Sequence, residues 1–195
     1  MKRKFLLSLT FIYCFALHAF PQNLVTLVED SVFSPNVNTY MKFYAVLPTN
    51  YDTYQDHYVA VYLLHGYGGN YTNWVTRTDL LNYAKDYRFI LITPDGKNSW
   101  YTNSPGAVKA GNYEDYIIND LIPFVDKKYR TLNERDSRAI VGLSMGGYGA
   151  MKFALKYPSK FSYAASFSGA LYVPGNMHLD GSAISKSQHA AFGKE

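Results

Sequence analysis

The stretch Gly142-Leu143-Ser144-Met145-Gly146-Gly147 decides the fold of this chain. An apolar run, residues 139–141, precedes it, and a helix-like segment, residues 148–157, follows it. The stretch therefore predicts a strand, a sharp turn and a helix, with Ser144 at the tip of the turn. It matches the pattern G-x-S-x-G, in which a strained turn between strand and helix exposes the serine hydroxyl. This pattern predicts that Ser144 is a catalytic nucleophile.

The two glycines that flank the serine have a steric explanation. Gly142 and Gly146 lie two residues before and after Ser144, where strand and helix approach so closely that side chains would collide. The amide N–H groups at the start of the helix point back toward the serine and favour negative charge there. The segment after the turn repeats its apolar residues with helical spacing, at Ala150, Phe153, Ala154 and Tyr157, and Pro158 ends it. An ordinary glycine-rich turn is the alternative, but the matching strand and helix favour the catalytic interpretation.

Length and composition indicate one globular domain. The chain has 195 residues, of which 48% are hydrophobic and 17% charged, enough to build a core and too apolar for disorder. The 19 tyrosines fit binding clefts and half-buried strands equally well. No repeat, linker or second domain is visible in the sequence.

The N-terminus has the pattern of a secretory signal peptide. Lys2, Arg3 and Lys4 precede an apolar run, residues 5–17, and we expect cleavage after Ala19. An uncleaved anchor is the alternative, although the run is short for a membrane span. Without these three basic residues the net charge falls from +4 to +1. That charge predicts no nucleic-acid partner, and no membrane partner is expected after cleavage.

The cysteine content agrees with export from a bacterium. Cys14 is the only cysteine and lies inside the apolar run, so the mature protein would have no disulfide. A lipoprotein interpretation of Cys14 is weak, because Tyr13 stands where a small residue is expected. We therefore predict a signal peptide at residues 1–19, a domain at residues 20–195, and a periplasmic or extracellular location.

The order of the remaining segments predicts an α/β sandwich with a mostly parallel sheet. Residues 59–64 are almost continuously apolar, as in a strand buried on both faces. Asn112 is expected to cap a helix that Pro123 should kink, and residues 79–86 form another helix candidate. Residues 171–195 show no clear periodicity. The strands are expected at residues 24–28 and 39–47, which would form an antiparallel hairpin at the sheet edge, and at residues 59–64, 89–92, 139–141 and 163–167.

A second glycine-rich loop, residues 65–70, follows the strand expected at residues 59–64. It lacks the Lys-Ser/Thr pair of a phosphate-binding P-loop. Its position after an early strand fits the loop that supplies an oxyanion donor to a catalytic serine. We assign the two donors to the N–H groups of Tyr67 and Met145. An ordinary strand–helix connection is the alternative, and His65 is expected to support the loop rather than to act in catalysis.

The loop at residues 98–105 contains two aromatic residues, Trp100 and Tyr101. Loops that follow strands are where open α/β sheets bind ligands, so both are candidates for a substrate pocket. Simple packing of the loop onto the domain explains them equally well. The sequence predicts no metal site and no cofactor.

Four stretches in order, residues 62–69, 98–101, 142–150 and 161–170, resemble the esterase D family of α/β-hydrolases. That family includes S-formylglutathione hydrolases, feruloyl esterases, mycolyltransferases and bacterial tributyrin esterases, and the chain looks most similar to the tributyrin and feruloyl esterase types. The resemblance covers roughly residues 35–170. It implies a three-layer α/β-hydrolase sandwich and an exported serine carboxylester hydrolase for short acyl esters, either small molecules or esters linked to polysaccharide. Ser144 would be the nucleophile, with an oxyanion hole at Tyr67 and Met145.

The chain departs from the family in its C-terminal part. In the family the acid and then the histidine follow the serine, each after a later strand. The candidates among the 51 residues after Ser144 are Asp180, His178 and His189, which come too early for those positions. The chain is then a fragment without its C-terminal part, a non-catalytic descendant that binds esters or carbohydrate, or a protein with a local triad of Asp180 and His189. An acyltransferase would use the same residues as a hydrolase. A missing C-terminal part predicts an exposed sheet edge.

Overall fold

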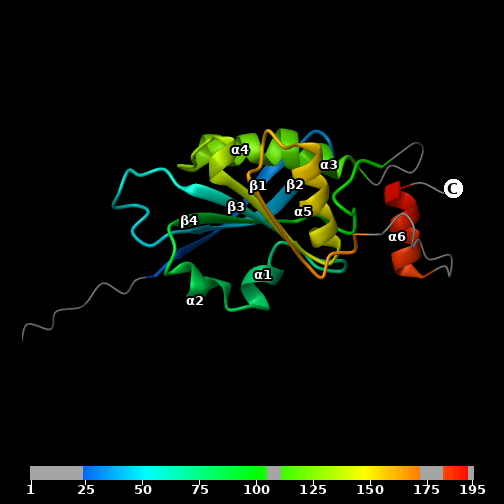
Figure 1. Cartoon of the computed structure of the whole chain (residues 1–195), viewed down its shortest axis with the longest axis horizontal. Helices are drawn as coiled ribbons and strands as arrows, with labels where there is room; N and C mark the ends of the chain where they lie inside the picture. The colour runs from blue at the N-terminus through cyan, green and yellow to red at the C-terminus, as the bar shows by residue number, and fades with distance from the viewer. Residues whose placement is uncertain (1–23, 105–110, 172–181, 193–195) are drawn as a thin grey trace, which may run out of the picture.

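The computed structural model describes residues 24–104, 111–171 and 182–192. The predicted signal peptide, Asp180 and His178 lie outside these residues. Helices lie on both faces of a six-stranded sheet, with α3, α4 and α5 on one side and α1 and α2 on the other (Figure 1). This arrangement confirms the predicted three-layer α/β sandwich. The helical segments are α1 Asn73–Thr76, α2 Leu80–Ala84, α3 Tyr113–Asp115, the π-helical η1 Tyr116–Leu121, α4 Ile122–Lys128, the 3-10 helix η2 Arg135–Ser137, α5 Met145–Lys156 and α6 Ala183–Phe192.

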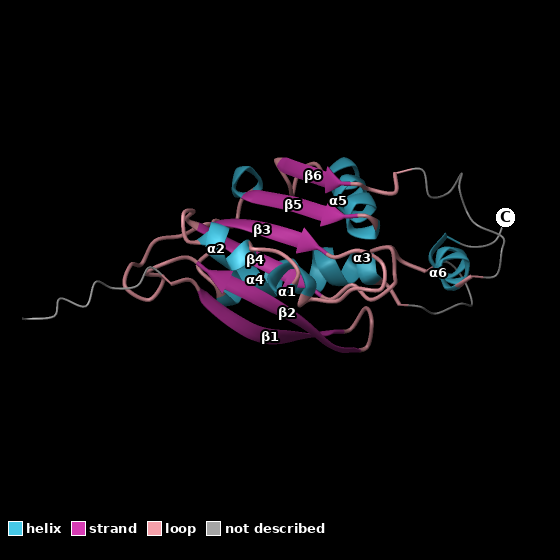
Figure 2. Cartoon of the chain, turned by 90° about the horizontal axis from the view of Figure 1, so that it is seen from below, coloured by secondary structure: helices cyan, strands magenta, loops and turns pink. Residues whose placement is uncertain are grey.

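The strands lie in the order β1-β2-β4-β3-β5-β6 (Figure 2). The pairs β3–β4, β3–β5 and β5–β6 are parallel, whereas β1–β2 and β2–β4 are antiparallel. A parallel core with an antiparallel hairpin at one edge was expected, and the structure confirms it. The strands are β1 Thr26–Ser34, β2 Thr39–Leu47, β3 Val59–Leu64, β4 Phe89–Pro94, β5 Arg138–Leu143 and β6 Tyr163–Phe167.

The first strand is longer than its sequence indicated. β1 continues to Ser34 and pairs with β2 along its whole length, from Thr26 opposite Leu47 to Ser34 opposite Thr39. Glu29 and Asp30 interrupt the apolar pattern, and this is why the sequence suggested an early end. In the structure their carboxylates form ion pairs with Lys42 and Lys128 at 2.8 and 2.7 Å, so an edge strand accommodates them.

The sheet separates a large core from a small one. Alternate side chains of a strand point to opposite faces, so β3 directs Tyr62 and Leu64 to the large core and Leu63 to the small one. Helices η1, α4 and α5 cover the large core, where Tyr62, Tyr116 and Phe153 are fully buried. The short helices α1 and α2 cover the small core. The large core therefore holds the domain together, and the small side leaves room for a pocket.

Two helical regions differ from the sequence predictions. Asn112 occupies the cap position, but its side chain makes no capping hydrogen bond, and Tyr116 N donates to its carbonyl at 2.9 Å. Pro123 lies in the first turn of α4 and follows the π-helical η1. Proline has no backbone N–H to donate, and the different hydrogen-bond pattern of the π-helix accommodates this missing donor. Residues 171–195 were expected to lack regular structure, yet α6 forms there, because its Phe192 packs against Trp100 and Tyr148.

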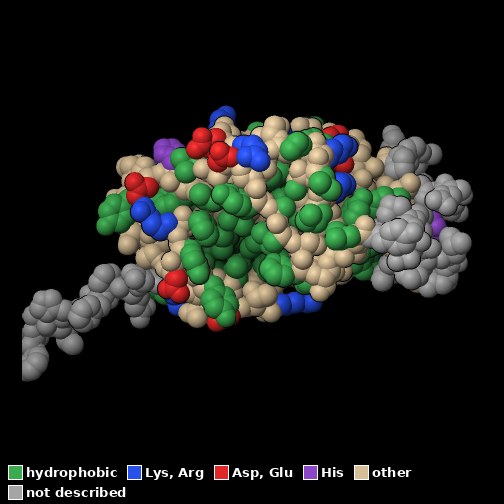
Figure 3. All heavy atoms as spheres, viewed as in Figure 1, with side chains coloured by type: hydrophobic (Ala, Val, Ile, Leu, Met, Phe, Trp, Pro, Cys, Tyr) green, Lys and Arg blue, Asp and Glu red, His purple; other side chains and the backbone are tan. Residues whose placement is uncertain are grey.

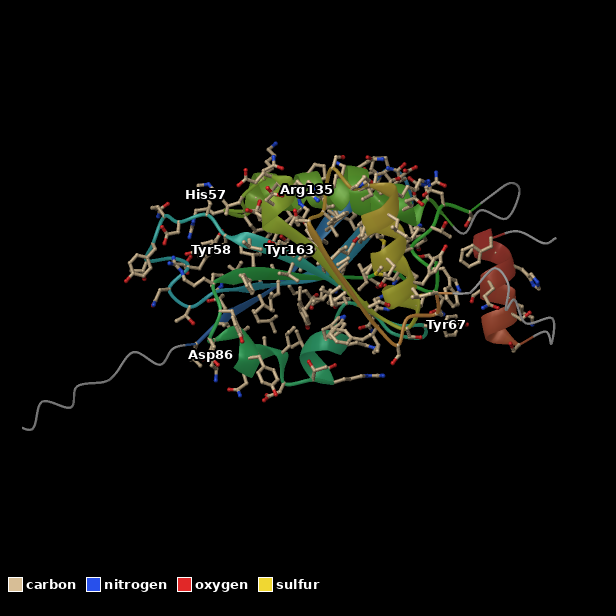
Figure 4. All side chains as sticks on the ribbon, viewed as in Figure 1. His57, Tyr58, Tyr67, Asp86, Arg135 and Tyr163 are labelled. Atoms are coloured by element: carbon tan, nitrogen blue, oxygen red, sulfur yellow. The ribbon has the colours of Figure 1, made fainter. Side chains whose placement is uncertain are left out.

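The edge strand β6 leaves apolar side chains in solvent. Tyr163 is 64% exposed and Phe167 54% exposed, and neighbouring Leu143 is 45% exposed. β6 has β5 on one side and no further strand on its other side within the described residues. Figure 3 shows apolar side chains gathered in a hollow at the centre of the face on which Figure 4 places Tyr163. The expected exposed sheet edge is therefore present. None of the helices in the described ranges has the length and hydropathy needed to cross a membrane.

A buried ion pair joins α3 to α5. The Glu114 carboxylate is 2.8 Å from Lys152 Nζ and 2.5 Å from Lys156 Nζ, and it accepts a hydrogen bond from the Tyr157 hydroxyl. Glu114 is only 3% exposed. Burial alone would raise the pKa of this carboxyl, but these three partners hold it at about 2. Burial also lowers the pKa of Lys152, and the hydrogen bond to Glu114 opposes that shift.

Replacing Glu114 with glutamine is expected to destabilise the fold by about 3 kcal/mol, because Lys152 is left buried without its counter-charge. The unfolded pKa of 4.5 lies above the folded pKa of about 2, so the wild-type advantage is complete above pH 4.5 and declines as the pH falls toward 2. Urea unfolding of both proteins between pH 7 and about pH 3 measures this. A difference in unfolding free energy that stays constant over that range would contradict the assignment.

Candidate active site

The turn between β5 and α5 holds Ser144 in a strained backbone conformation. Its φ is 54° and its ψ is −115°, a backbone conformation that residues other than glycine rarely adopt. Three backbone hydrogen bonds fix it: Ser144 N donates to Phe167 O at 2.9 Å, and Ser144 O accepts from Tyr148 N at 3.0 Å and from Ala170 N at 3.3 Å. The end of β6 and the first turn of α5 thus hold the serine from two sides. Such strain at one serine is typical of a functional residue.

Close backbone contacts explain the glycines of this turn. A Cβ on Gly142 would lie 2.0 Å from Gly146 O, so strand and helix meet as the sequence predicted. A Cβ on Gly146 would lie 2.3 Å from Leu64 O, at the end of β3. The second contact could not be predicted from the turn itself, because Leu64 belongs to a strand that is distant in the sequence. Gly146 therefore lets the turn approach the loop that follows β3.

That loop, residues 65–70, lies directly beside Ser144. A Cβ on Gly66 would be 3.5 Å from Ser144 Cβ. A tight turn in which Gly69 N donates to Gly66 O at 3.1 Å bends the loop, and Gly68 supports it with a φ of 73°. Among the described residues, no group accepts a hydrogen bond from the N–H of Tyr67 or of Met145. Neither predicted donor therefore has an acceptor within the described ranges, and Met145 is the first residue of α5, where helix N–H groups lack internal partners.

His65 supports the loop, as expected. Its Nδ1 lies 2.8 Å from Gly66 O, and its Nε2 accepts a hydrogen bond from Gly96 N at 2.9 Å. Burial alone would raise the pKa of the adjoining Asp95 carboxyl, but the His65 ring and two hydrogen bonds from Lys97 hold it at about 2. His65 thus joins the loop after β3 to the loop after β4.

No described histidine contacts the Ser144 hydroxyl. His57 precedes β3 and lies at the opposite end of the sheet from Tyr67 (Figure 4). Because six strand residues span about 20 Å, His57 is far from the turn at Ser144. His65 has both ring nitrogens engaged, and His189 lies on α6, which packs against Trp100 through Phe192. Within residues 24–104, 111–171 and 182–192, the candidate nucleophile Ser144 therefore has no histidine as a hydrogen-bonding partner.

The structure does not bring Trp100 and Tyr101 to a pocket beside Ser144. Trp100 is 4% exposed, and its indole N–H donates to the Ser187 hydroxyl at 3.1 Å. Tyr101 is fully buried and donates its hydroxyl proton to His65 O at 3.1 Å. Both residues adopt positive φ values, and both side chains are buried. They pack the loop against the body, which was the alternative left open by the sequence.

A pocket of about 270 Å³ opens beside the serine instead. Sequence reasoning missed one of its walls, because α1 has only four residues and shows no periodicity. The pocket wall combines apolar and polar groups and, among the described residues, contains no carboxylate. Its lining residues are His65, Gly66, Tyr67, Asn73, Trp74, Arg77, Thr78, Leu143 and Ser144. The described residues also contain no group of three His, Cys, Asp or Glu side chains that could hold a metal ion.

A serine on a strained strand–helix turn beside a glycine-rich loop, at the carboxyl ends of parallel strands in a three-layer sandwich, defines the α/β-hydrolase class. The family model Esterase, described as "Putative esterase", matches residues 34–192. The chain therefore belongs to this esterase family, as its resemblance to the esterase D family implied.

Individual relatives agree with the family. The chain is 37% identical over 142 residues to Esterase Rv1288 of Mycobacterium tuberculosis, covering 70% of this chain and 29% of that protein. It is 33% identical over 114 residues to an acetyl esterase of Caldicellulosiruptor saccharolyticus, covering 58% of this chain and 42% of that protein. The chain thus spans less than half the length of these two curated relatives.

A solved structure shows the same fold. The fluorophosphonate-binding serine hydrolase F of Staphylococcus aureus matches with a TM-score of 0.77 and 27% identity, over 88% of this chain and 67% of that one. An S-formylglutathione hydrolase of Staphylococcus aureus matches with a TM-score of 0.71 and 28% identity, over 87% and 66%.

Proposed function

We propose that this protein is an exported serine carboxylester hydrolase that acts on short acyl esters through an acyl-enzyme intermediate. The observation that carries the proposal is the strained Ser144 beside the Gly66–Tyr67 loop in an open pocket. Relatives named acetyl esterase and feruloyl esterase support an ester substrate, either a small molecule or an ester attached to polysaccharide. The basic and apolar residues 2–17 support export.

In the proposed reaction Ser144 Oγ attacks the ester carbonyl carbon, and the carbonyl oxygen becomes an oxyanion. The N–H groups of Tyr67 and Met145 would donate to that oxyanion, and each such donor contributes about 3 kcal/mol to stabilising the transition state. The tetrahedral intermediate then expels the alcohol and leaves the acyl group on Ser144, and water releases it. The reaction also needs a general base for the Ser144 proton and an acid to orient that base. We assign neither role to a described residue.

The formation of the acyl-enzyme can be tested directly. We expect that mixing the chain with p-nitrophenyl acetate releases p-nitrophenolate and adds one acetyl group to the protein. Mass spectrometry of the digested protein should locate that group on Ser144. An unmodified Ser144 would contradict catalysis by this chain and would favour a non-catalytic protein that binds esters or carbohydrate. Addition of an alcohol to the reaction separates the two enzyme classes, because an acyltransferase would form a new ester from it.

A further inference from the structure

The pocket beside Ser144 contains one positively charged side chain, Arg77, at the end of α1. Its backbone N–H donates to Asn73 O at 2.9 Å, but its guanidinium contacts no carboxylate, carbonyl or aromatic ring among the described residues. The other described arginines all donate side-chain hydrogen bonds: Arg88 to Asp56, Arg130 to Tyr51 O, Arg135 to Asp136 and Arg138 to Asp126. Arg77 is thus the one arginine of the described chain whose charge has no partner.

The two polar side chains that follow Arg77 in the sequence, Thr78 and Asp79, have other partners. The nearest carboxylate in the sequence, Asp79, accepts a hydrogen bond from the Asn82 side chain at 3.2 Å. The Thr78 hydroxyl donates to Trp74 O and accepts from Leu80 N at 3.2 Å. Because no Asp or Glu of the described residues lines the pocket, nothing there neutralises the guanidinium. An anionic ligand in the pocket would therefore meet one arginine charge and no carboxylate among the described lining residues.

We propose that Arg77 binds a carboxylate carried by the half of the ester that occupies this pocket, so that the preferred substrates are esters with one free carboxylate. A guanidinium presents a planar fork of N–H donors that matches a carboxylate in two parallel hydrogen bonds. Trp74 and Leu143 supply apolar walls for the carbon skeleton between ester and carboxylate. A volume of about 270 Å³ is small for a ligand site and favours a compact group. This inference rests on the proposed ester hydrolase function and specifies its substrate class.

The test measures binding rather than turnover, so it does not depend on the acyl-enzyme. The Ser144→Ala chain is titrated with 4-acetoxybenzoate and with its neutral methyl ester by isothermal calorimetry at low ionic strength. We expect about tenfold tighter binding of the anion, the size of a solvent-accessible charge-assisted hydrogen bond. Raising the salt concentration should reduce this preference, because mobile ions screen exposed charges.

Variants assign the preference to one side chain. In Arg77→Gln the two ligands should bind equally, with the affinity for the neutral ester within twofold of the parent. Arg77→Lys should keep part of the preference, since lysine retains the charge but loses the planar fork. Arg88→Gln removes an arginine charge outside the pocket and should keep the whole preference.

Three results would overturn the proposal: equal binding of the two ligands to the parent, a preference that survives in Arg77→Gln, or no binding of the anion. Failure of the proposed reaction has a different signature. In that case wild-type Ser144 stays unacetylated while the Ser144→Ala chain still prefers the anion.

Discussion

Replacing Ser144 with alanine is expected to abolish labelling of the protein by a fluorophosphonate probe. The probe reacts with an activated serine hydroxyl, and the proposed nucleophile Ser144 lies at a strained turn in a pocket. In serine hydrolases the loss of this group lowers the rate about a million-fold, which leaves only the effect of the oxyanion donors. The measurement is in-gel fluorescence of the labelled chain, followed by mapping of the modified peptide.

Two control variants show that the serine itself is responsible. Ser168→Ala removes an exposed hydroxyl two residues before Ala170 and should label like the wild type. Ser144→Gly should also lose the label, yet its melting temperature should rise, since glycine accepts a φ of 54° and a ψ of −115° with less strain. The gain is expected to be about 1 kcal/mol. Full labelling of Ser144→Ala would refute Ser144 as the nucleophile.

Replacing Gly146 with alanine is expected to destabilise the domain by about 4 kcal/mol, a large part of the 5–15 kcal/mol by which domains of this size are stable. The added Cβ would lie 2.3 Å from Leu64 O and 2.7 Å from His65 O. Both neighbours are backbone atoms at the end of β3, so no side-chain rotation relieves the overlap. Either the turn or the strand must move. Urea unfolding followed by circular dichroism measures the loss.

A second glycine separates steric overlap from backbone strain. Gly68 has a φ of 73° but no atom within 4 Å of an added Cβ. Gly68→Ala should therefore cost only the strain of a left-handed residue, about 1 kcal/mol. If both variants lost the same stability, the overlap at Gly146 would not be what demands glycine there. A Gly146→Ala protein that does not fold, beside a folded Gly68→Ala protein, also fits the expectation.

Local sequence patterns predicted most of the sheet. Continuous apolar runs marked β3 and the start of β4, because strands buried on both faces need apolar side chains at every position. The same reasoning failed for β1, whose acidic residues Glu29 and Asp30 find lysine partners on β2 and α4. It also failed for α6, which has a weak apolar face and depends on contacts of Phe192 with residues far away in the sequence. Such contacts leave no local pattern to read.

In the candidate site, too, local sequence patterns predicted some residues, whereas others depend on contacts between distant segments. The G-x-S-x-G pattern predicted Ser144 as nucleophile and the glycine-rich loop predicted Tyr67 as oxyanion donor, and both residues line the same pocket. Trp100 and Tyr101 were equally consistent with a pocket and with packing, and the structure places both in the interior. Arg77 could not be predicted from the sequence, because the four-residue helix α1 before it gives no periodic signal. The proposed role of Arg77 also depends on the lack of a carboxylate among the described residues that line the pocket, which only the structure shows.

The sequence by itself determined the sheet class, the turn at Ser144 and the two glycines beside it, because each depends on steric rules within a few neighbouring residues. The tertiary structure alone decided that Gly146 lies against the end of β3, that His65 joins two loops, and that Arg77 lines the pocket without an ion-pair partner among the described residues. These features arise where β3, β4 and β5 end side by side. Which groups meet there is fixed by packing between segments that are distant in the chain, and such pairings are not encoded in any single stretch.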